Sequence, residues 1–195
     1  HLSSHYNVTM LTLYRFSQRL ARTELFVAGS FMAFIFLLLI INIITRLNNI
    51  PIYWIDEAAV TAMVWMALLA AAAGIHYRTT IAMTLLKDRL SQSAQYRLDL
   101  CVDTLLMLFF AVFLALLIMI FEPYQLIVKH RLDWAAFSST EFNFVYEEPT
   151  MTLGIKKFWT WLILPIFAVS GLIHSLANWC HTMTLLRQEH SHVSN

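Results

Sequence analysis

The sequence predicts an all-α membrane protein with four transmembrane helices, and three observations point to this class. First, 59% of the residues are hydrophobic and only 13% are charged, whereas a soluble domain carries about 25% charged residues. Second, four apolar runs are long enough to cross a bilayer. Third, only four glycines and four prolines interrupt the chain. Because a backbone inside a bilayer must satisfy its own polar groups, we expect these runs to be helices.

A transmembrane helix needs about 20 apolar residues, and four segments come close to this length or exceed it. The first is too long for a signal peptide and is followed by charge instead of a cleavage site. No Gly-rich or Ser-rich linker separates the runs, so we expect a single four-helix membrane domain over residues 1–195. The predicted spans are residues 25–45, 58–75, 100–121 and 158–178.

The orientation follows from the Lys and Arg residues outside the spans. Eight of these 13 residues lie on the side of the two termini and five on the other side. The bias is strongest at the first span, where Arg15, Arg19 and Arg22 precede the helix and only Arg46 lies in the next loop. Because basic residues concentrate on the cytoplasmic side, we expect both termini to be cytoplasmic. The formal net charge of +1 gives no reason to expect nucleic acid as a partner.

Two segments outside the spans have patterns typical of interfacial helices. In Met10–Thr23, apolar residues fall on one side and three arginines on the other, which suits a helix in the lipid headgroups; a solvated helix is the alternative. The loop Glu122–Lys157 is long for a helix connection. It contains YQLIVKHRLDWAAF, a second interfacial candidate, and EFNFVYEEP, which alternates like a short strand. This loop faces outward in the predicted topology and is a candidate docking surface for an extracytoplasmic partner.

Charged residues flank the short loop between the first two spans. Arg46 ends the first span, and Asp56 and Glu57 open the second, where the positive end of the helix dipole stabilises carboxylates. Pro51 cannot continue the first helix and helps the chain to turn. Since an unpaired Arg near hydrocarbon is costly, we expect an Arg46–Glu57 ion pair across the hairpin. Unpaired boundary charges among the headgroups are the alternative.

Small and polar residues within the spans predict helix packing. The second span has small residues four apart, at Ala58 and Ala62 and again at Ala70 and Gly74, a spacing that lets helices approach closely. The fourth span has one small and polar face, which should pack on another helix and not on lipid. That face consists of Ser170, Gly171, His174, Ser175 and Asn178.

The spans show no pattern that predicts transport or catalytic chemistry. Asn42 and Asp103 stand alone, Asp103 is expected to be solvated near the cytoplasmic boundary, and the span interiors lack the buried carboxylates that mark ion and substrate paths. There is no P-loop, CxxC or HExxH motif, so we expect no enzyme, no catalytic residues and no metal site. His76 and His174 lie at similar depth and could ligate a b-type haem. A haem-bearing anchor of an electron-transfer complex is therefore the main alternative, ahead of a stand-alone exporter.

Two blocks of sequence resemble the small membrane subunit of tripartite ATP-independent periplasmic (TRAP) transporters, the DctQ-like family. The blocks are RLNNIPIYWIDEAAVTAMVW and TLGIKKFWTWLILPIFAVSGLIHSL. The matching residues are Arg46, Trp54, Asp56, Glu57 and Trp65 in the first block, and Thr152, Leu153, Gly154, Trp159, Pro165 and His174 in the second. The resemblance covers about residues 24–180. It departs from the family at Thr80, Ile81 and Thr84, which replace a His-Ile-x-Val-Asp stretch, and in a longer third loop.

The resemblance implies a multi-pass protein of the bacterial inner membrane with a role in transport. In this family a periplasmic binding protein delivers an organic acid to a large membrane subunit, which moves it with a sodium gradient. The small subunit is a scaffold against which the large subunit moves. The implied partners are the large TRAP membrane subunit, the periplasmic binding protein and membrane lipid. Substrate and sodium are expected in the large subunit, and no substrate-binding residues or cofactor are expected in this chain.

Overall fold

A computed structural model describes the backbone of residues 2–78 and 90–193 and the side chains of residues 10–78 and 90–186. The departures from the family pattern at Thr80, Ile81 and Thr84 lie outside these residues, as do Lys87 and Arg89.

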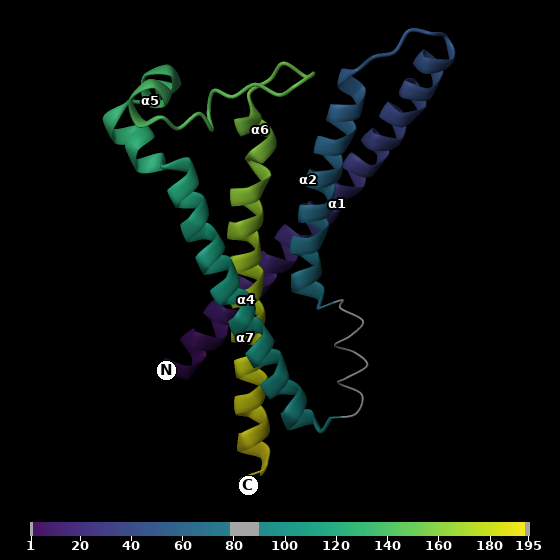
Figure 1. Cartoon of the computed structure of the whole chain (residues 1–195). Coiled ribbons are helices and arrows are strands. Elements are labelled where there is room, and N and C mark those ends of the chain that lie inside the picture. The colour runs from purple at the N-terminus through teal and green to yellow at the C-terminus, as the bar shows by residue number, and fades with distance from the viewer. Residues whose placement is uncertain (1, 79–89, 194–195) are drawn as a thin grey trace. The chain divides into compact units, whose positions relative to one another are not determined.

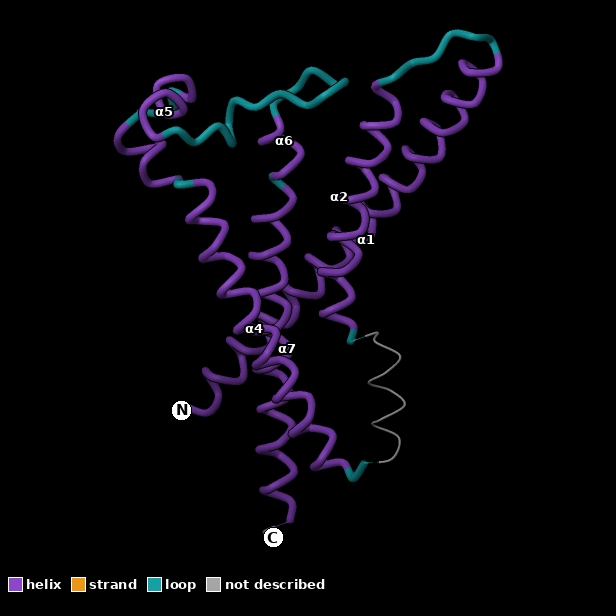
Figure 2. Tube along the Cα trace, viewed as in Figure 1, coloured by secondary structure: helices purple, strands orange, loops and turns teal. Residues whose placement is uncertain are grey.

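Helices dominate the described residues, with loops between them (Figures 1 and 2). In the part of the chain that the structure describes, four helices are long and apolar enough to cross a membrane, which confirms the predicted number of spans. The elements are α1 (Leu2–Leu47), α2 (Trp54–Tyr77), α4 (Gln92–Phe121), the π-helix η1 (Gln125–Lys129), α5 (Trp134–Glu141), α6 (Lys157–Trp161) and α7 (Ile163–Val193). The break between α6 and α7 falls three residues before Pro165, which has no N–H to donate to the preceding turn.

The predicted interfacial helix at Met10–Thr23 is not a separate element, because α1 is continuous from Leu2 to Leu47. Its two-sided pattern is nevertheless present: the three arginines are exposed, and Ser17 and Ala21 are buried. The buried side faces helices of the same chain, since Ser17 bonds to α2 and α7. The apolar side of this segment therefore serves helix packing within the protein.

The loop Glu122–Lys157 also differs from the prediction. The segment expected to form one interfacial helix holds two short ones, η1 and α5, because Arg131 and Leu132 adopt positive φ angles of 47° and 67° between them. The segment expected to form a strand is coil and turn; among described residues, pairing there is limited to an isolated bridge between Pro149 and Lys156.

The described chain divides into two compact units, and each takes a part of all four long helices. The terminal unit comprises His1–Phe26, Leu69–Val112 and Phe167–Asn195. The loop unit comprises Val27–Leu68 and Phe113–Ile166 and contains both η1 and α5.

The buried side chains of α1 follow one stripe. Successive members are three or four residues apart, as in coiled-coil packing; at one place a position is skipped and the step is seven residues. The stripe consists of Ser17, Ala21, Glu24, Ala28, Ile35, Leu38 and Asn42. Most other apolar side chains of α1 are exposed, among them Phe26 and Met32. In a membrane protein such exposed positions face lipid or a partner helix.

The predictions of packed faces on the second and fourth spans are confirmed in part. All five members of the polar face on the fourth span are buried, which confirms that this face packs on other helices. In α2, Ala62 is buried and Ala58 half-buried, whereas Ala70 is exposed. Of the two small-residue pairs, the first therefore packs within the chain.

Candidate functional site

The α1–α2 hairpin of the loop unit is closed by a polar triad of Asn42, Arg46 and Asp56. Nη2 of Arg46 lies 2.8 Å from Oδ2 of Asp56. Asn42 bridges the pair, because its Nδ2 donates to Oδ1 of Asp56 over 2.7 Å and its Oδ1 accepts from Nε of Arg46 over 3.0 Å. The expected Arg46–Glu57 pair is therefore wrong, and Asn42 is not isolated.

The local geometry explains why Arg46 pairs with Asp56 and not with Glu57. Asn42 and Arg46 are four residues apart and share one face of α1. Asp56 follows Ile55, which is fully buried against Leu38 at the same end of the hairpin. The Arg46 and Asp56 side chains are 59% and 54% exposed, and exposed pairs of this kind contribute about 0–1 kcal/mol. The triad orients the hairpin more than it stabilises it.

Glu57 instead binds the loop that precedes the fourth span, and we call this contact the Glu57 clasp. Its carboxylate accepts from the backbone N–H of Met151 (3.0 Å), Thr152 (2.6 Å) and Leu153 (2.9 Å), and from the Thr152 hydroxyl (2.6 Å). Successive N–H groups in a turn form a concave anion site. Gly154 ends this turn with φ of +68°, a conformation that favours glycine. The clasp thus joins the two sequence blocks that carry the family resemblance.

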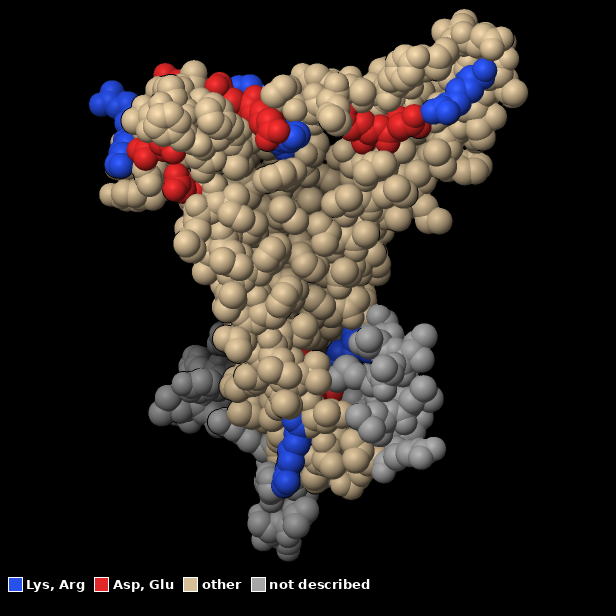
Figure 3. Space-filling model, viewed as in Figure 1, with Lys and Arg blue, Asp and Glu red and all other residues tan. Residues whose placement is uncertain are grey.

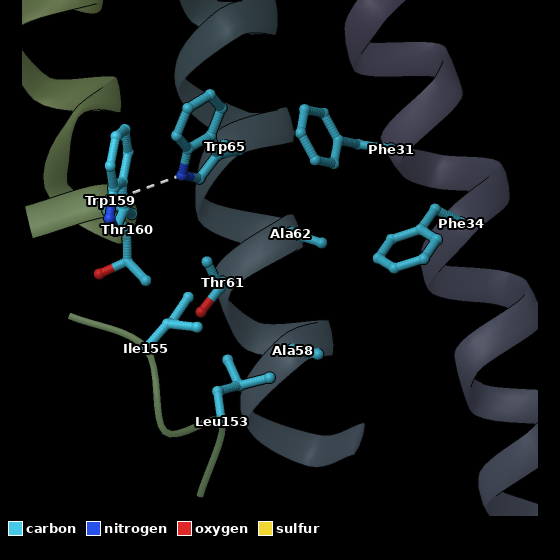
Figure 4. Close-up of a pocket in the computed structure, with 10 residues that line it drawn as sticks. All are labelled: Phe31, Phe34, Ala58, Thr61, Ala62, Trp65, Leu153, Ile155, Trp159 and Thr160. Carbon is cyan, nitrogen blue, oxygen red and sulfur yellow. Dashed lines mark hydrogen bonds between the residues drawn. The ribbon is translucent and has the colours of Figure 1, made fainter. Parts of the chain in front are cut away.

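An apolar pocket of about 240 Å³ lies beside the clasp in the loop unit (Figure 4). Trp65 forms one wall; its ring lies 5.8 Å from that of Phe31, and its Nε1 donates to the carbonyl of Thr160 over 3.0 Å. Figure 4 shows Leu153 and Trp159 from the second sequence block on another side. Trp65 of the first block and Trp159 of the second therefore line one pocket, whereas Trp54 at the start of α2 is exposed and does not line it.

Aromatic rings hold the loop Glu122–Lys157 together. Trp134, Tyr146 and Phe158 pack with centroids 5.0–5.8 Å apart, and Lys156 lies over the Trp134 ring at 4.5 Å. The Tyr146 hydroxyl donates to the carbonyl of Phe121 at the end of α4 over 2.5 Å. Burial, with a smaller contribution from the Glu122 charge, raises the pKa of Tyr146 above its usual range. The loop is therefore anchored to the end of its own span.

The exposed surface of this loop combines charge with apolar groups. On the face in Figure 3, charged side chains of the loop unit gather over its loops and helix ends. Two Lys–Glu pairs lie among them, Lys156 with Glu147 at 3.7 Å and Lys157 with Glu148. Met151 is 93% exposed at the clasped turn. Such a mixed surface suits contact with another protein.

The terminal unit contains a buried polar line that we call the Ser17 cluster: Ser17, Glu24, His76, Ser170 and His174. Ser17 Oγ lies 2.8 Å from Nδ1 of His76 and 2.7 Å from Nδ1 of His174. Nε2 of His174 lies 2.9 Å from Oε2 of Glu24, and the Ser170 hydroxyl donates to Oε1 of Glu24. Ser17 and His174 are both 0% exposed. The cluster ties α1, α2 and α7 together within this unit.

The order Ser17–His174–Glu24 has the connectivity of a serine hydrolase triad, but it does not support that chemistry. A nucleophilic serine must reach a substrate, and Ser17 is fully buried with its oxygen shared between two histidines. The haem alternative gains no support either. A haem held between two histidines needs a free nitrogen on each ring, whereas both nitrogens of His174 are in hydrogen bonds.

A second polar group in the terminal unit surrounds Arg78 at the end of α2. Its guanidinium lies 2.6 Å from Asp99 and 2.5 Å from Asp103 of α4, and it donates to the Thr182 hydroxyl of α7 over 2.8 Å. Asp103 is buried, so the expectation that it is solvated is wrong. Removing one partner of a buried ion pair costs about 3–5 kcal/mol, which makes Arg78 a strong link between α2, α4 and α7.

Sequence reasoning missed the buried carboxylates Glu24 and Asp99, and it expected the buried Asp103 to be solvated. Glu24 lies one residue before the predicted first span, and the alternating spacing that links it to Ser17 and Asn42 along α1 was the signal that could have found it. The expectation that the spans lack buried carboxylates is therefore wrong. Each of the three is in contact with a basic or hydroxyl group of another helix.

These features define a multi-pass helical membrane protein whose buried polar groups connect its own helices. The chain matches the family described as "Tripartite ATP-independent periplasmic transporters, DctQ component" over residues 35–185. It therefore belongs to the DctQ family, the small membrane component of TRAP transporters, which is a family of transporter components and not of enzymes. No curated protein and no solved structure matches the chain.

Proposed function

We propose that this chain is the scaffold subunit of a sodium-driven TRAP transporter that takes up an organic acid delivered by a periplasmic binding protein across the bacterial inner membrane. The observation that carries the proposal is the match to the DctQ component over residues 35–185. Both sequence blocks lie within that range, and the Glu57 clasp links them physically. The partners in this proposal are the large membrane subunit, the binding protein and membrane lipid.

The use of the buried polar groups supports a scaffold role. A transport site needs polar groups that can exchange partners, often at broken helices near the midplane. Here the Ser17 cluster and the Arg78 group connect helices to each other. Among the described residues no cluster of His, Cys, Asp and Glu is suited to hold a metal ion. In this proposal substrate and sodium bind to the large subunit.

The loop unit supplies the outward surface in this proposal. With both termini cytoplasmic, the loop Glu122–Lys157 faces the periplasm. The clasp and the aromatic cluster fix its shape, and Met151 and Phe142 are exposed on it. We assign this surface to contact with the binding protein, and the exposed apolar sides of the helices to lipid and the large subunit.

Uptake in proteoliposomes tests the scaffold role. Vesicles that contain this chain alone should show no sodium-driven uptake, even with the binding protein and a sodium gradient present. Vesicles that also contain the large subunit should show it, and vesicles with the large subunit but without this chain should show less. Uptake by this chain alone, or full uptake without it, would overturn the proposal.

A further inference from the structure

The Ser17 cluster constrains where its protons lie. Ser17 has one hydroxyl proton and two imidazole neighbours at 2.8 and 2.7 Å, so it donates to one ring and accepts from the other. If His174 is neutral and its Nε2–H points to Glu24, then its Nδ1 accepts from Ser17. Ser17 in turn must accept from an Nδ1–H of His76. Every hydrogen bond of the line is satisfied in this state.

A second state with one more proton satisfies the same bonds. If His174 is an imidazolium, its Nε2–H still donates to Glu24 and its Nδ1–H donates to Ser17. The Ser17 hydroxyl then donates to Nδ1 of His76, and the proton of that ring lies on Nε2. The heavy atoms keep their positions in both states, because the same contacts serve in opposite directions.

We propose that the Ser17 cluster is a proton-binding relay, which takes up one proton at His76 and holds it on His174 beside Glu24. The incoming proton binds the lone pair on Nε2 of His76. The N–H bond at Nδ1 of His76 breaks as its proton bonds to Ser17 Oγ. The former O–H bond of Ser17 breaks as its proton bonds to Nδ1 of His174. One proton enters, one positive charge appears on His174, and no electrons are transferred.

The surrounding charges favour retention of that proton. Without it, Glu24 is a buried anion in a membrane-spanning segment, which is costly; with it, His174 and Glu24 form a neutral pair at 2.9 Å. The charge of Arg78 is already compensated by two aspartates. The titratable and charged groups around the line are Tyr14 of α1, Tyr77 and Arg78 at the end of α2, Asp99 and Asp103 of α4, and His181 of α7.

Nitrogen NMR of the full chain in lipid nanodiscs tests the relay. The chain carries ¹⁵N-labelled histidine, and the signals of His76 and His174 are assigned by their loss in His76→Gln and His174→Gln. In a titration between about pH 5 and pH 9, around the ordinary histidine range, His174 should gain its second N–H at the same midpoint at which His76 moves its proton from Nδ1 to Nε2. Protonation of His174 with an unchanged tautomer of His76, or no change in either ring, would refute the proposal.

Variants separate the relay from simple packing. Ser17→Ala breaks the line and should abolish the coupled change of His76. Ser175→Ala is the matched control, because Ser175 is also fully buried and its hydroxyl donates to the backbone carbonyl of Leu172; the coupling should persist there. Coupling that survives Ser17→Ala would contradict the relay. The wild-type titration decides the question even if Ser17→Ala fails to fold, and it is independent of any transport assay.

Discussion

Replacing Gly171 with alanine should destabilise the terminal unit, although the same change in an isolated helix would be stabilising. A Cβ at Gly171 in α7 would meet three ring atoms of Phe110 in α4, the farthest of them at 2.6 Å. Phe110 is 1% exposed, and its ring packs against those of Phe109 and Phe167 with centroids 5.1 and 5.2 Å away. The ring therefore has little room to move aside.

Two opposing contributions set the size of the effect. Alanine in a helix interior is about 1 kcal/mol more favourable than glycine, whereas an extra methyl group forced into a packed core costs about 1–3 kcal/mol. The contact with Phe110 is far shorter than a van der Waals contact, so we place the cost of the extra methyl group at or slightly above about 3 kcal/mol, the upper end of that range. The net loss is then about 2 kcal/mol, or a fall in Tm of about 4–8 °C for a chain of this length.

Thermal unfolding of the purified chain in nanodiscs measures this loss, and Gly29→Ala is the matched control. Gly29 is also helical, in α1, but a Cβ there has no neighbour within 4 Å, so its Tm should stay constant or rise. Shortening the obstructing ring with Phe110→Leu should reduce the cost of Gly171→Ala, since the two changes act on one contact. If the Gly171→Ala and Gly29→Ala variants unfold at the same Tm, then α4 and α7 do not approach each other closely at Gly171.

Two further predictions concern the loop unit and the topology. Glu57→Gln should lower the Tm more than Asp56→Asn, because Glu57 accepts four hydrogen bonds and Asp56 accepts two. Thr152→Ala should make Glu57→Gln less costly, and equal effects of the two carboxylate changes would count against the clasp. In a chain without its two native cysteines, a cysteine at Ser139 should react with an impermeant reagent from outside the cell and one at Ser91 should not. The reverse labelling pattern would overturn the orientation.

The sequence was sufficient to predict the spans and the packed face of α7. Both depend on a simple physical requirement: backbone groups in lipid must be satisfied within a helix, and polar residues in a span avoid lipid. His174 and Asn178 were expected on a packed face, and both are buried. Their partners were not predicted, because Ser17 is 157 residues from His174 in the chain.

The errors have a common cause: which charged side chains pair depends on their positions in space, and the sequence does not give these positions. Asp103 looked solvated because it lies near a span boundary, yet Arg78 reaches it across the terminal unit. We expected Arg46 to pair with Glu57 because an unpaired Arg near hydrocarbon is costly, whereas the turn of α2 directs Asp56 toward Arg46 and leaves Glu57 to the loop before α6. Periodicity identifies a face of a helix, but it does not identify which of two adjacent carboxylates meets a given cation.

The Glu57 clasp gives a physical reason for the two sequence blocks to occur together. An acidic residue in the first turn of α2 needs donors, and the Thr-Leu-Gly turn supplies backbone N–H groups and a hydroxyl. Gly154 lets the chain leave that turn at a positive φ, so a bulkier residue there would be strained. The exposed pair of Arg46 and Asp56 contributes little by comparison. Of the two carboxylates at the start of α2, Asp56 therefore closes the α1–α2 hairpin, and Glu57 holds the loop before α6 in one conformation.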